Sequence, residues 1–174
     1  MIIRSTMAAV AALTVLGLLT AAAAGRPAAP QAPKKVTKDG VGQVKRNMTH
    51  KELRAKGLVG RLRPGCELGG GATRSARLLA PLRGQVNYSL TNPRLAKIII
   101  VRRGARAKGV GRGDTIPEIK AKFPHARVNK DTEEVFRLWL VTVPKRDGGK
   151  FQFAVDADTE RITLIGVPII TFCE

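Results

Sequence analysis

The residues with the clearest capacity for chemistry are five cations in one short stretch. Guanidinium and ammonium groups pair with phosphate and carboxylate oxygens, and arginine can do so through two parallel hydrogen bonds. We therefore expect this stretch to be the contact surface for an anion. The alternative is that arginine enrichment reflects compositional bias and gives only a soluble charged face. The five residues are Arg102, Arg103, Arg106, Lys108 and Arg112.

The charge around this basic patch is unevenly distributed. The chain carries 31 Lys and Arg against 13 Asp and Glu, a net charge of +18. Residues 34–130 hold a surplus of 19 positive charges, whereas residues 131–174 have a deficit of 3. The basic part should attract polyanions such as an anionic envelope polymer or lipid surface. Nucleic acid is a weaker candidate, because only 4% of the residues are aromatic and could stack on bases.

Side chains suited to catalysis or metal binding are sparse. Catalysis needs a base or nucleophile held in a poised position. The two histidines, His50 and His125, are expected at the ends of short helices and in solvent. Asp156, Asp158 and Glu160 lack the remaining oxygen ligands of a calcium loop. We expect no catalytic residue, no cofactor and no metal, with an unrecognised hydrolase as the alternative from the enzyme class.

The N-terminus has the three parts of a secretory signal peptide. Arg4 supplies the positive charge, Met7–Leu19 form the apolar stretch, and Ala22-Ala23-Ala24 precede Gly25 as small residues for cleavage. Residues 1–24 are therefore predicted to be a signal peptide, and the mature protein to be extracellular or held in the cell wall without a transmembrane anchor. The alternative is an uncleaved membrane anchor, but a spanning helix needs about 20 apolar residues.

The remainder is predicted to be a linker and one domain. Prolines among alanines at the start of residues 25–40 favour an extended linker, and residues 41–174 suffice for one core. In an oxidising compartment, Cys66 and Cys173 are expected to form a disulfide. Closing a loop of about 100 residues would stabilise the fold by a few kcal/mol. The alternative is two unpaired thiols.

An internal repeat organises the predicted domain. Residues 46–56 align without gaps on residues 112–122, with five identities. Each segment has a threonine followed three residues later by a glutamate, the pattern of a capping box that begins a helix. We expect helices over Thr49–Lys56 and Ile116–Phe123. The repeats are assigned to residues 41–103 and 104–174.

Strands are predicted to follow each helix. Alternating apolar residues indicate one hairpin over residues 86–101 and another over residues 151–167, with Arg94 aligned on Arg161. A further strand is expected over Glu134–Val143, with a poorly patterned counterpart near Ser75–Leu82. The predicted fold class is α+β, made of two tandem repeats of a short helix plus antiparallel strands.

This arrangement resembles the tandem-repeat fold of beta-lactamase-inhibitor-protein-like domains and of secreted proteins from high-GC Gram-positive bacteria. The resemblance rests on the short motif Gly109-Val110-Gly111-Arg112-Gly113-Asp114-Thr115, followed by Glu118-Ile119 and Phe123-Pro124. It implies a protein-binding or envelope role and no catalysis. The function expected is that of a secreted, non-enzymatic binding protein of the cell envelope, using the basic patch. The alternative is an inhibitor or effector that docks on another protein, and nothing in the sequence indicates the oligomeric state.

Overall fold

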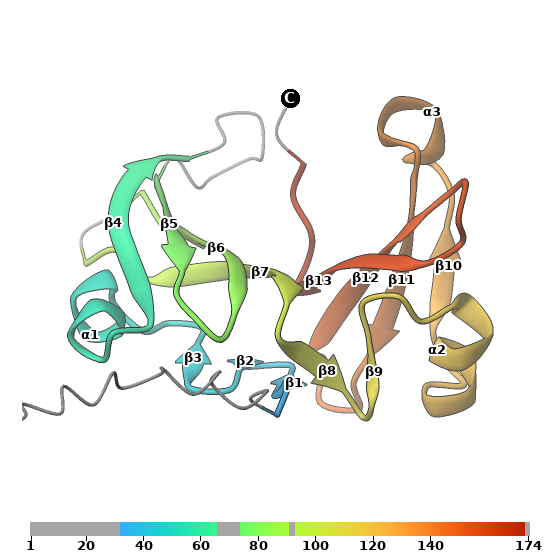
Figure 1. Cartoon of the computed structure of the whole chain (residues 1–174), viewed down its shortest axis with the longest axis horizontal. Helices are drawn as coiled ribbons and strands as arrows, with labels where there is room; N and C mark the ends of the chain where they lie inside the picture. Colours follow the sequence, from blue (N-terminus) through green and yellow to red (C-terminus); the bar gives the residue numbers. More distant parts are fainter. Residues whose placement is uncertain (1–31, 66–73, 91–92, 173–174) are drawn as a thin grey trace, which may run out of the picture. The chain divides into compact units, whose positions relative to one another are not determined.

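The computed structural model describes residues 32–65, 74–90 and 93–172 (Figure 1). The predicted signal peptide and both cysteines of the predicted disulfide lie outside the described residues. The elements run in chain order: β1 Lys34–Thr37, β2 Gly40–Val41, β3 Val44–Lys45, α1 His50–Ala55, β4 Val59–Pro64, β5 Arg74–Leu78, β6 Arg83–Tyr88, β7 Ala96–Arg103, β8 Ala105–Ala107, β9 Val110–Gly111, α2 Ile116–Lys122, β10 Arg127–Asn129, α3 Glu133–Phe136, β11 Leu138–Pro144, β12 Lys150–Asp156 and β13 Ile162–Val167.

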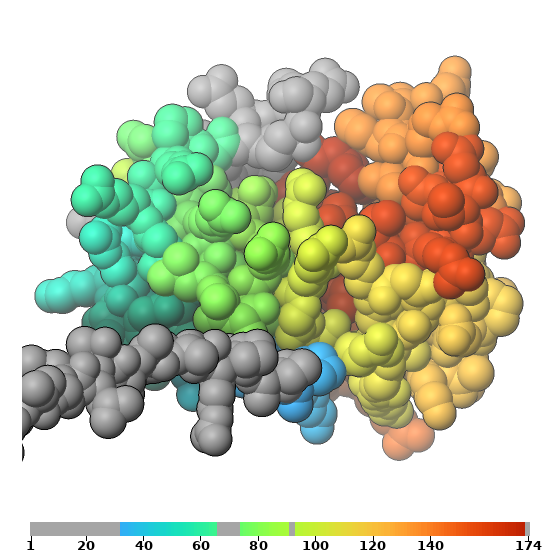
Figure 2. Space-filling model, in the orientation of Figure 1, coloured from blue at the N-terminus to red at the C-terminus, as the bar shows by residue number. Residues whose placement is uncertain are grey.

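The strands form two sheets and the helices of the described residues are short, which is compatible with the predicted α+β class. The larger sheet is antiparallel, with eight strands in the order β10-β11-β12-β13-β7-β6-β5-β4. At its centre β7 pairs with β13, which brings Val101 opposite Ile165. The smaller sheet has the order β3-β2-β1-β8-β9, with β1 parallel to β8. On the face shown in Figure 2, yellow-green atoms from the β7–β8 region lie between the green and the red parts of the chain.

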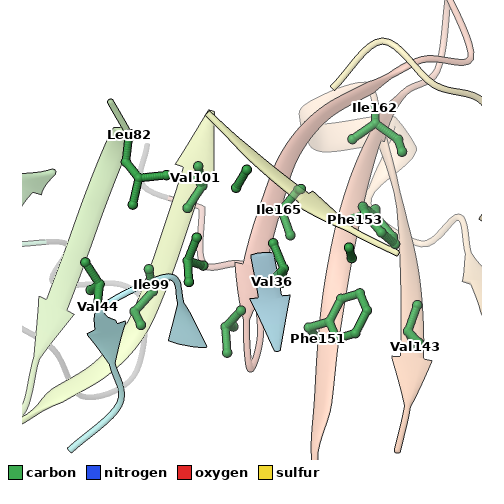
Figure 3. Close-up of a cluster of buried hydrophobic side chains, with 14 of the residues drawn as sticks. Val36, Val44, Leu82, Ile99, Val101, Val143, Phe151, Phe153, Ile162 and Ile165 are labelled. Atoms are coloured by element: carbon green, nitrogen blue, oxygen red, sulfur yellow. The ribbon is translucent and has the colours of Figure 1, made fainter. Parts of the chain in front are cut away.

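One hydrophobic core lies between the larger sheet and the elements that cover one of its faces. Each of the first two helices contributes one fully buried side chain, Leu53 from α1 and Ile119 from α2. Figure 3 shows Val36 of β1 among side chains of the larger sheet, including Phe151 and Ile165. Burying a side chain of this size contributes about 1.5–3 kcal/mol, so this shared core holds both sheets together.

Both capped helices begin where the sequence predicts. The Glu52 carboxylate accepts hydrogen bonds from the backbone N–H of Thr49 at 2.7 Å and from its hydroxyl at 2.8 Å. The Glu52 N–H donates to the Thr49 hydroxyl at 3.2 Å. At α2, the Glu118 carboxylate accepts from the N–H and hydroxyl of Thr115, both at 2.7 Å. These bonds stabilise the carboxylate form and lower the pKa of both glutamates.

The chain pairs with itself in the same way at two places, 66 residues apart. Thr49 forms an isolated antiparallel β-bridge with Leu95, and Thr115 forms one with Arg161. This geometry places Leu95, not Arg94, in the position of Arg161, so the sequence alignment of this hairpin is wrong by one residue. The backbone bonds agree: the Asn47 N–H donates to the Ala96 carbonyl at 2.8 Å, and the Gly113 N–H donates to the Ile162 carbonyl at 2.9 Å.

The folded part begins earlier than expected. The strand β1 occupies Lys34–Thr37, inside the segment assigned to a linker. Its first residue is held by a bond of 2.7 Å from the Lys34 N–H to the Gly104 carbonyl, and Val36 is 5% exposed in the core. The linker prediction is therefore wrong for this strand. The reason is that β1 is stabilised by pairing with β8, which lies about seventy residues further along the chain.

The strand expected over Glu134–Val143 is replaced at its start by a helical turn. The helix α3 ends at Phe136 and is followed by its C-cap residue Arg137, which adopts the left-handed conformation with φ 50°. The indole N–H of Trp139 donates to the Glu133 carboxylate at 2.7 Å and ties this turn to β11. The strand itself then runs over Leu138–Pro144. Near Ser75–Leu82, the weakly patterned counterpart is the strand β5 at Arg74–Leu78.

Candidate anion-binding groove

A groove of about 500 Å³ opens over the junction of the two halves of the larger sheet. It lies where β7 ends beside the starts of β6 and β13, and it is lined by arginines together with a few polar and apolar residues. No Asp or Glu is among the described residues that line it. Its five arginines are Arg77, Arg83, Arg102, Arg103 and Arg112, and the other lining residues are Gly84, Gln85, Thr163 and Leu164.

Strand register brings these arginines together. Arg83 of β6 lies directly opposite Arg103 of β7, and the next pairing skips a residue, so that Gly84 faces Val101. Gly84 has φ 149°, and an added Cβ there would meet the Ile100 carbonyl oxygen at 2.0 Å. Only glycine fits this close approach. The irregularity it permits has the geometry of a β-bulge, which re-aims side chains near the end of a strand.

The groove lined by these five arginines, here called the arginine groove, carries positive charge that no carboxylate in its described lining neutralises. All five arginines are exposed, and none forms an ion pair or side-chain hydrogen bond within the part of the chain that the structure describes. Like charges directly opposite each other on neighbouring strands are destabilising, as for Arg83 and Arg103. An anion with several phosphate or carboxylate groups would remove this repulsion and accept hydrogen bonds from several guanidinium groups.

The structure divides the basic patch that the sequence predicts. Arg102, Arg103 and Arg112 line the groove together, although Arg112 comes from the turn after β9. Arg106 is engaged elsewhere: its guanidinium donates to the Asp114 carboxylate at 3.0 Å. Arg106 therefore has a structural partner and is not available to an anion in the same way.

Lys108 also leaves the predicted patch. Its ammonium lies 5.5 Å from the centre of the Phe123 ring, in a separate pocket. Arg106 and Lys108 thus do not line the groove together with Arg102, Arg103 and Arg112. The reason is the β8–β9 hairpin, which has Arg106 opposite Gly111 and Ala107 opposite Val110, and turns at Lys108.

Arg77 and Arg83 belong to the arginine groove but were absent from the predicted site. They lie 19 or more residues before Arg102 in the sequence, and only the pairing of β5, β6 and β7 brings them to it. A local signal exists for Arg77, because it lies between the buried residues Ala76 and Leu78 and must point away from the core. The sequence pattern alone does not show which strands are neighbours.

The other candidate residues have ordinary structural partners. His50 is half-buried rather than in solvent: its Nε2 lies 3.0 Å from the Gly60 carbonyl, and its ring packs edge-on against Tyr88. His125 is exposed. In the acidic turn, the Asp156 carboxylate accepts from the N–H and hydroxyl of Thr159 at 2.8 Å.

Asp158 pairs with Arg137, so both aspartates of this turn are engaged by protein groups. Among the described residues, no three His, Cys, Asp or Glu side chains gather as a metal site would require.

Comparisons of this chain with protein-family models, with curated proteins and with solved structures gave no match. Within the described ranges, no helix has the length and apolar character needed to cross a membrane.

Proposed function

We propose that this protein is a non-enzymatic binding protein whose arginine groove holds an anionic polymer with a phosphate backbone. The observation that carries the proposal is the set of five exposed arginines in one groove whose described lining has no carboxylate. A phosphate chain presents repeated charges along a line, and arginine binds phosphate oxygens through its planar fork.

The proposed place of action is outside the cytoplasm. This part of the proposal rests on the signal-peptide pattern of residues 1–24 and on the pair Cys66 and Cys173, which would form a disulfide after export. There, a teichoic-acid-like polymer of the envelope would supply the phosphate backbone. Single-stranded nucleic acid has the same charge but also needs aromatic platforms, and the described lining of the groove contains none.

The proposed scaffold is a duplicated unit of about 66 residues, similar in plan to the beta-lactamase-inhibitor-protein-like repeat. Its support is the constant spacing between equivalent bridges, Thr49 with Leu95 and Thr115 with Arg161. In the larger sheet the strand order of one half mirrors that of the other about the β7–β13 pair. The groove then lies where two copies of one unit meet, and only the joined pair brings Thr163 and Leu164 beside the arginines of the first half.

A non-enzymatic role agrees with how the titratable side chains are used. The His50 ring is engaged by a carbonyl and by Tyr88, and the carboxylates of Glu52 and Glu118 serve as helix caps. These groups stabilise the fold rather than stand ready for proton transfer to a substrate.

The test is binding of fluorescein-labelled inorganic polyphosphate, followed by fluorescence anisotropy. Arg102→Gln with Arg112→Gln should weaken binding about tenfold and at most about thirtyfold, since exposed ion pairs contribute up to about 1 kcal/mol each. The matched control is Lys51→Gln with Lys97→Gln, which removes the same charge at exposed positions outside the groove. Equal losses in both double variants would show that only net charge matters and would overturn the proposal.

The salt dependence of binding distinguishes the proposed function from the alternative, which is docking on another protein. A protein that docks on another protein's surface through buried apolar contacts would capture its partner in high salt. Polymer binding through the groove should weaken steeply as salt rises. Polyphosphate binding that does not change with salt would contradict the proposed function.

A further inference from the structure

A second pocket, of about 440 Å³, is lined by residues that are all different from those of the arginine groove. Its walls come from β1 and the turn after it, from the end of α2, and from the β11–β12 turn. Two aromatic rings line it: Phe123 and Phe151 meet edge to face with their centres 5.5 Å apart. Val36 and Ala107 also line the pocket but belong to the core, with 5% and 1% of their surface exposed. This volume falls within the usual range for small-molecule sites, about 300–1,000 Å³.

Two ammonium groups converge on these rings. The Lys108 ammonium lies 5.5 Å from the centre of the Phe123 ring, and that of Lys145 lies 5.1 Å from it. Lys145 is also 5.0 Å from the centre of the Phe151 ring. Partial burial and the nearby charge of Lys108 lower the pKa of Lys145. The two amines thus share an apolar site in which their charges repel each other.

Both carboxylates that line this pocket already pair with Lys38. Asp147 lies 2.6 Å from the Lys38 ammonium, and Asp39 lies 3.8 Å from it. Neither Lys108 nor Lys145 forms an ion pair within the described ranges of the chain. Five cations and two carboxylates line the pocket, which leaves a surplus of three positive charges beside an apolar wall.

The backbone at Lys108 is unusual for a residue with a side chain. It adopts the left-handed conformation with φ 48°, which favours glycine or asparagine. At the position 66 residues earlier the chain has Gly42, with φ 57°. Phe123 likewise corresponds to Gly57. The second half therefore has a strained lysine and an aromatic ring where the first half has glycines, and both of these side chains face the pocket.

We propose that this pocket, here called the lysine–phenylalanine pocket, binds a small carboxylate with an apolar body. The body would lie against the exposed part of Phe123 and the side chains of the two lysines, and the carboxylate would take the position between the ammonium groups of Lys108 and Lys145. Such a ligand removes the repulsion between the two amines and covers the apolar wall. A phosphate polymer offers no apolar body, so this site is separate from the arginine groove and does not depend on the proposed function.

The experiment measures binding of 1-anilinonaphthalene-8-sulfonate by its fluorescence and then its displacement by small acids. Benzoate and hexanoate test a ring and a chain as the apolar body. Acetate supplies the charge with little body, and benzamide supplies the body without charge. Displacement by benzoate or hexanoate should need at least about tenfold less competitor than displacement by acetate or benzamide, because both parts of the ligand contribute.

Two single-residue variants test whether the probe binds in the lysine–phenylalanine pocket. Lys108→Gly should weaken binding at least fivefold and also raise the unfolding midpoint, because glycine relieves the left-handed strain. A merely structural lysine would not combine these two effects. Lys145→Gln should weaken binding with wild-type circular dichroism, and it serves on its own if Lys108→Gly fails to fold.

Two controls separate this site from the groove. Arg102→Gln with Arg112→Gln and Lys51→Gln with Lys97→Gln should bind the fluorescent probe like the wild type. Equal displacement by acetate and benzoate would overturn the proposal, as would wild-type binding in the Lys145→Gln variant. A loss of probe binding in the arginine double variant would assign the probe to the groove and contradict the second site.

Discussion

The cross-strand pair Arg83 and Arg103 offers a test in which stability and binding should move in opposite directions. The perturbation is Arg83→Gln with Arg103→Gln, which keeps polar side chains at both positions. The two arginines lie directly opposite each other, and neither has an ion-pair partner in the described part of the chain. If the two arginines served only to stabilise the fold, replacing them would destabilise it. If they serve to bind an anion, replacing them should not lower the stability of the unliganded protein.

The magnitudes follow from this geometry. Removing like charges that face each other should stabilise the unliganded protein by about 0.2–1 kcal/mol. Polyphosphate at about 100 times its Kd stabilises the wild type by about 2.7 kcal/mol. Losing two exposed ion pairs weakens binding by up to about thirtyfold, so the same polyphosphate concentration stabilises the variant by only about 1 kcal/mol. The order of stability therefore reverses when the polymer is added.

The assay is thermal unfolding followed by circular dichroism at low salt, with and without polyphosphate. The control is Lys51→Gln with Lys97→Gln, which should keep the full stabilisation by polymer apart from a small loss of general attraction. A variant that is less stable than the wild type without polymer, and equally stabilised by it, would refute the reasoning about the groove.

Three further predictions concern the elements that position the site. Thr49→Ala removes the hydroxyl that accepts the Glu52 N–H and should lower the free energy of unfolding in urea by about 1 kcal/mol; an unchanged midpoint would contradict the capping role. Because the folded-state pKa of Glu52 and Glu118 lies below the ordinary value of 4.5, their contribution is complete above that pH and is lost as pH falls through the lowered pKa. Unfolding of the Glu52→Gln with Glu118→Gln variant should thus depend less on pH below about pH 5 than that of the wild type, and an unchanged pH dependence would contradict this contribution. Gly84→Ala should destabilise the fold by at least about 1–3 kcal/mol and weaken polyphosphate binding, since its Cβ cannot fit against β7; wild-type stability would show that the bulge is not needed.

Local sequence signals predicted the elements that depend on local chemistry. The threonine–glutamate pairs begin both capped helices because the hydrogen bonds they make span only three residues. Alternating Phe151, Phe153 and Val155 predicted β12 because one face of that strand is buried.

Elements that depend on distant partners were missed. The strand β1 has little alternation and forms because β8 lies beside it. The helical turn α3 is completed by the left-handed Arg137 and by the bond from Trp139 to Glu133, neither of which the pattern of apolar residues encodes.

The candidate site was predicted in part for the same reason. Arg102 and Arg103 are adjacent in sequence, and both line the groove. Arg83 joins them only through strand register, which a single sequence does not determine. Arg106 does not line the groove, and its guanidinium pairs with Asp114, which follows β9.

The most direct test of the central claim is the salt dependence of polyphosphate binding by the wild type and by Arg102→Gln with Arg112→Gln. If all five arginines contact phosphates, the logarithm of the association constant should fall with a slope of about −3.5 against the logarithm of salt concentration. Affinity should then drop about a hundredfold between about 50 mM and about 200 mM salt, and the double variant should show a slope of about −2. Equal slopes for the two proteins would contradict the claim that these arginines form the binding site.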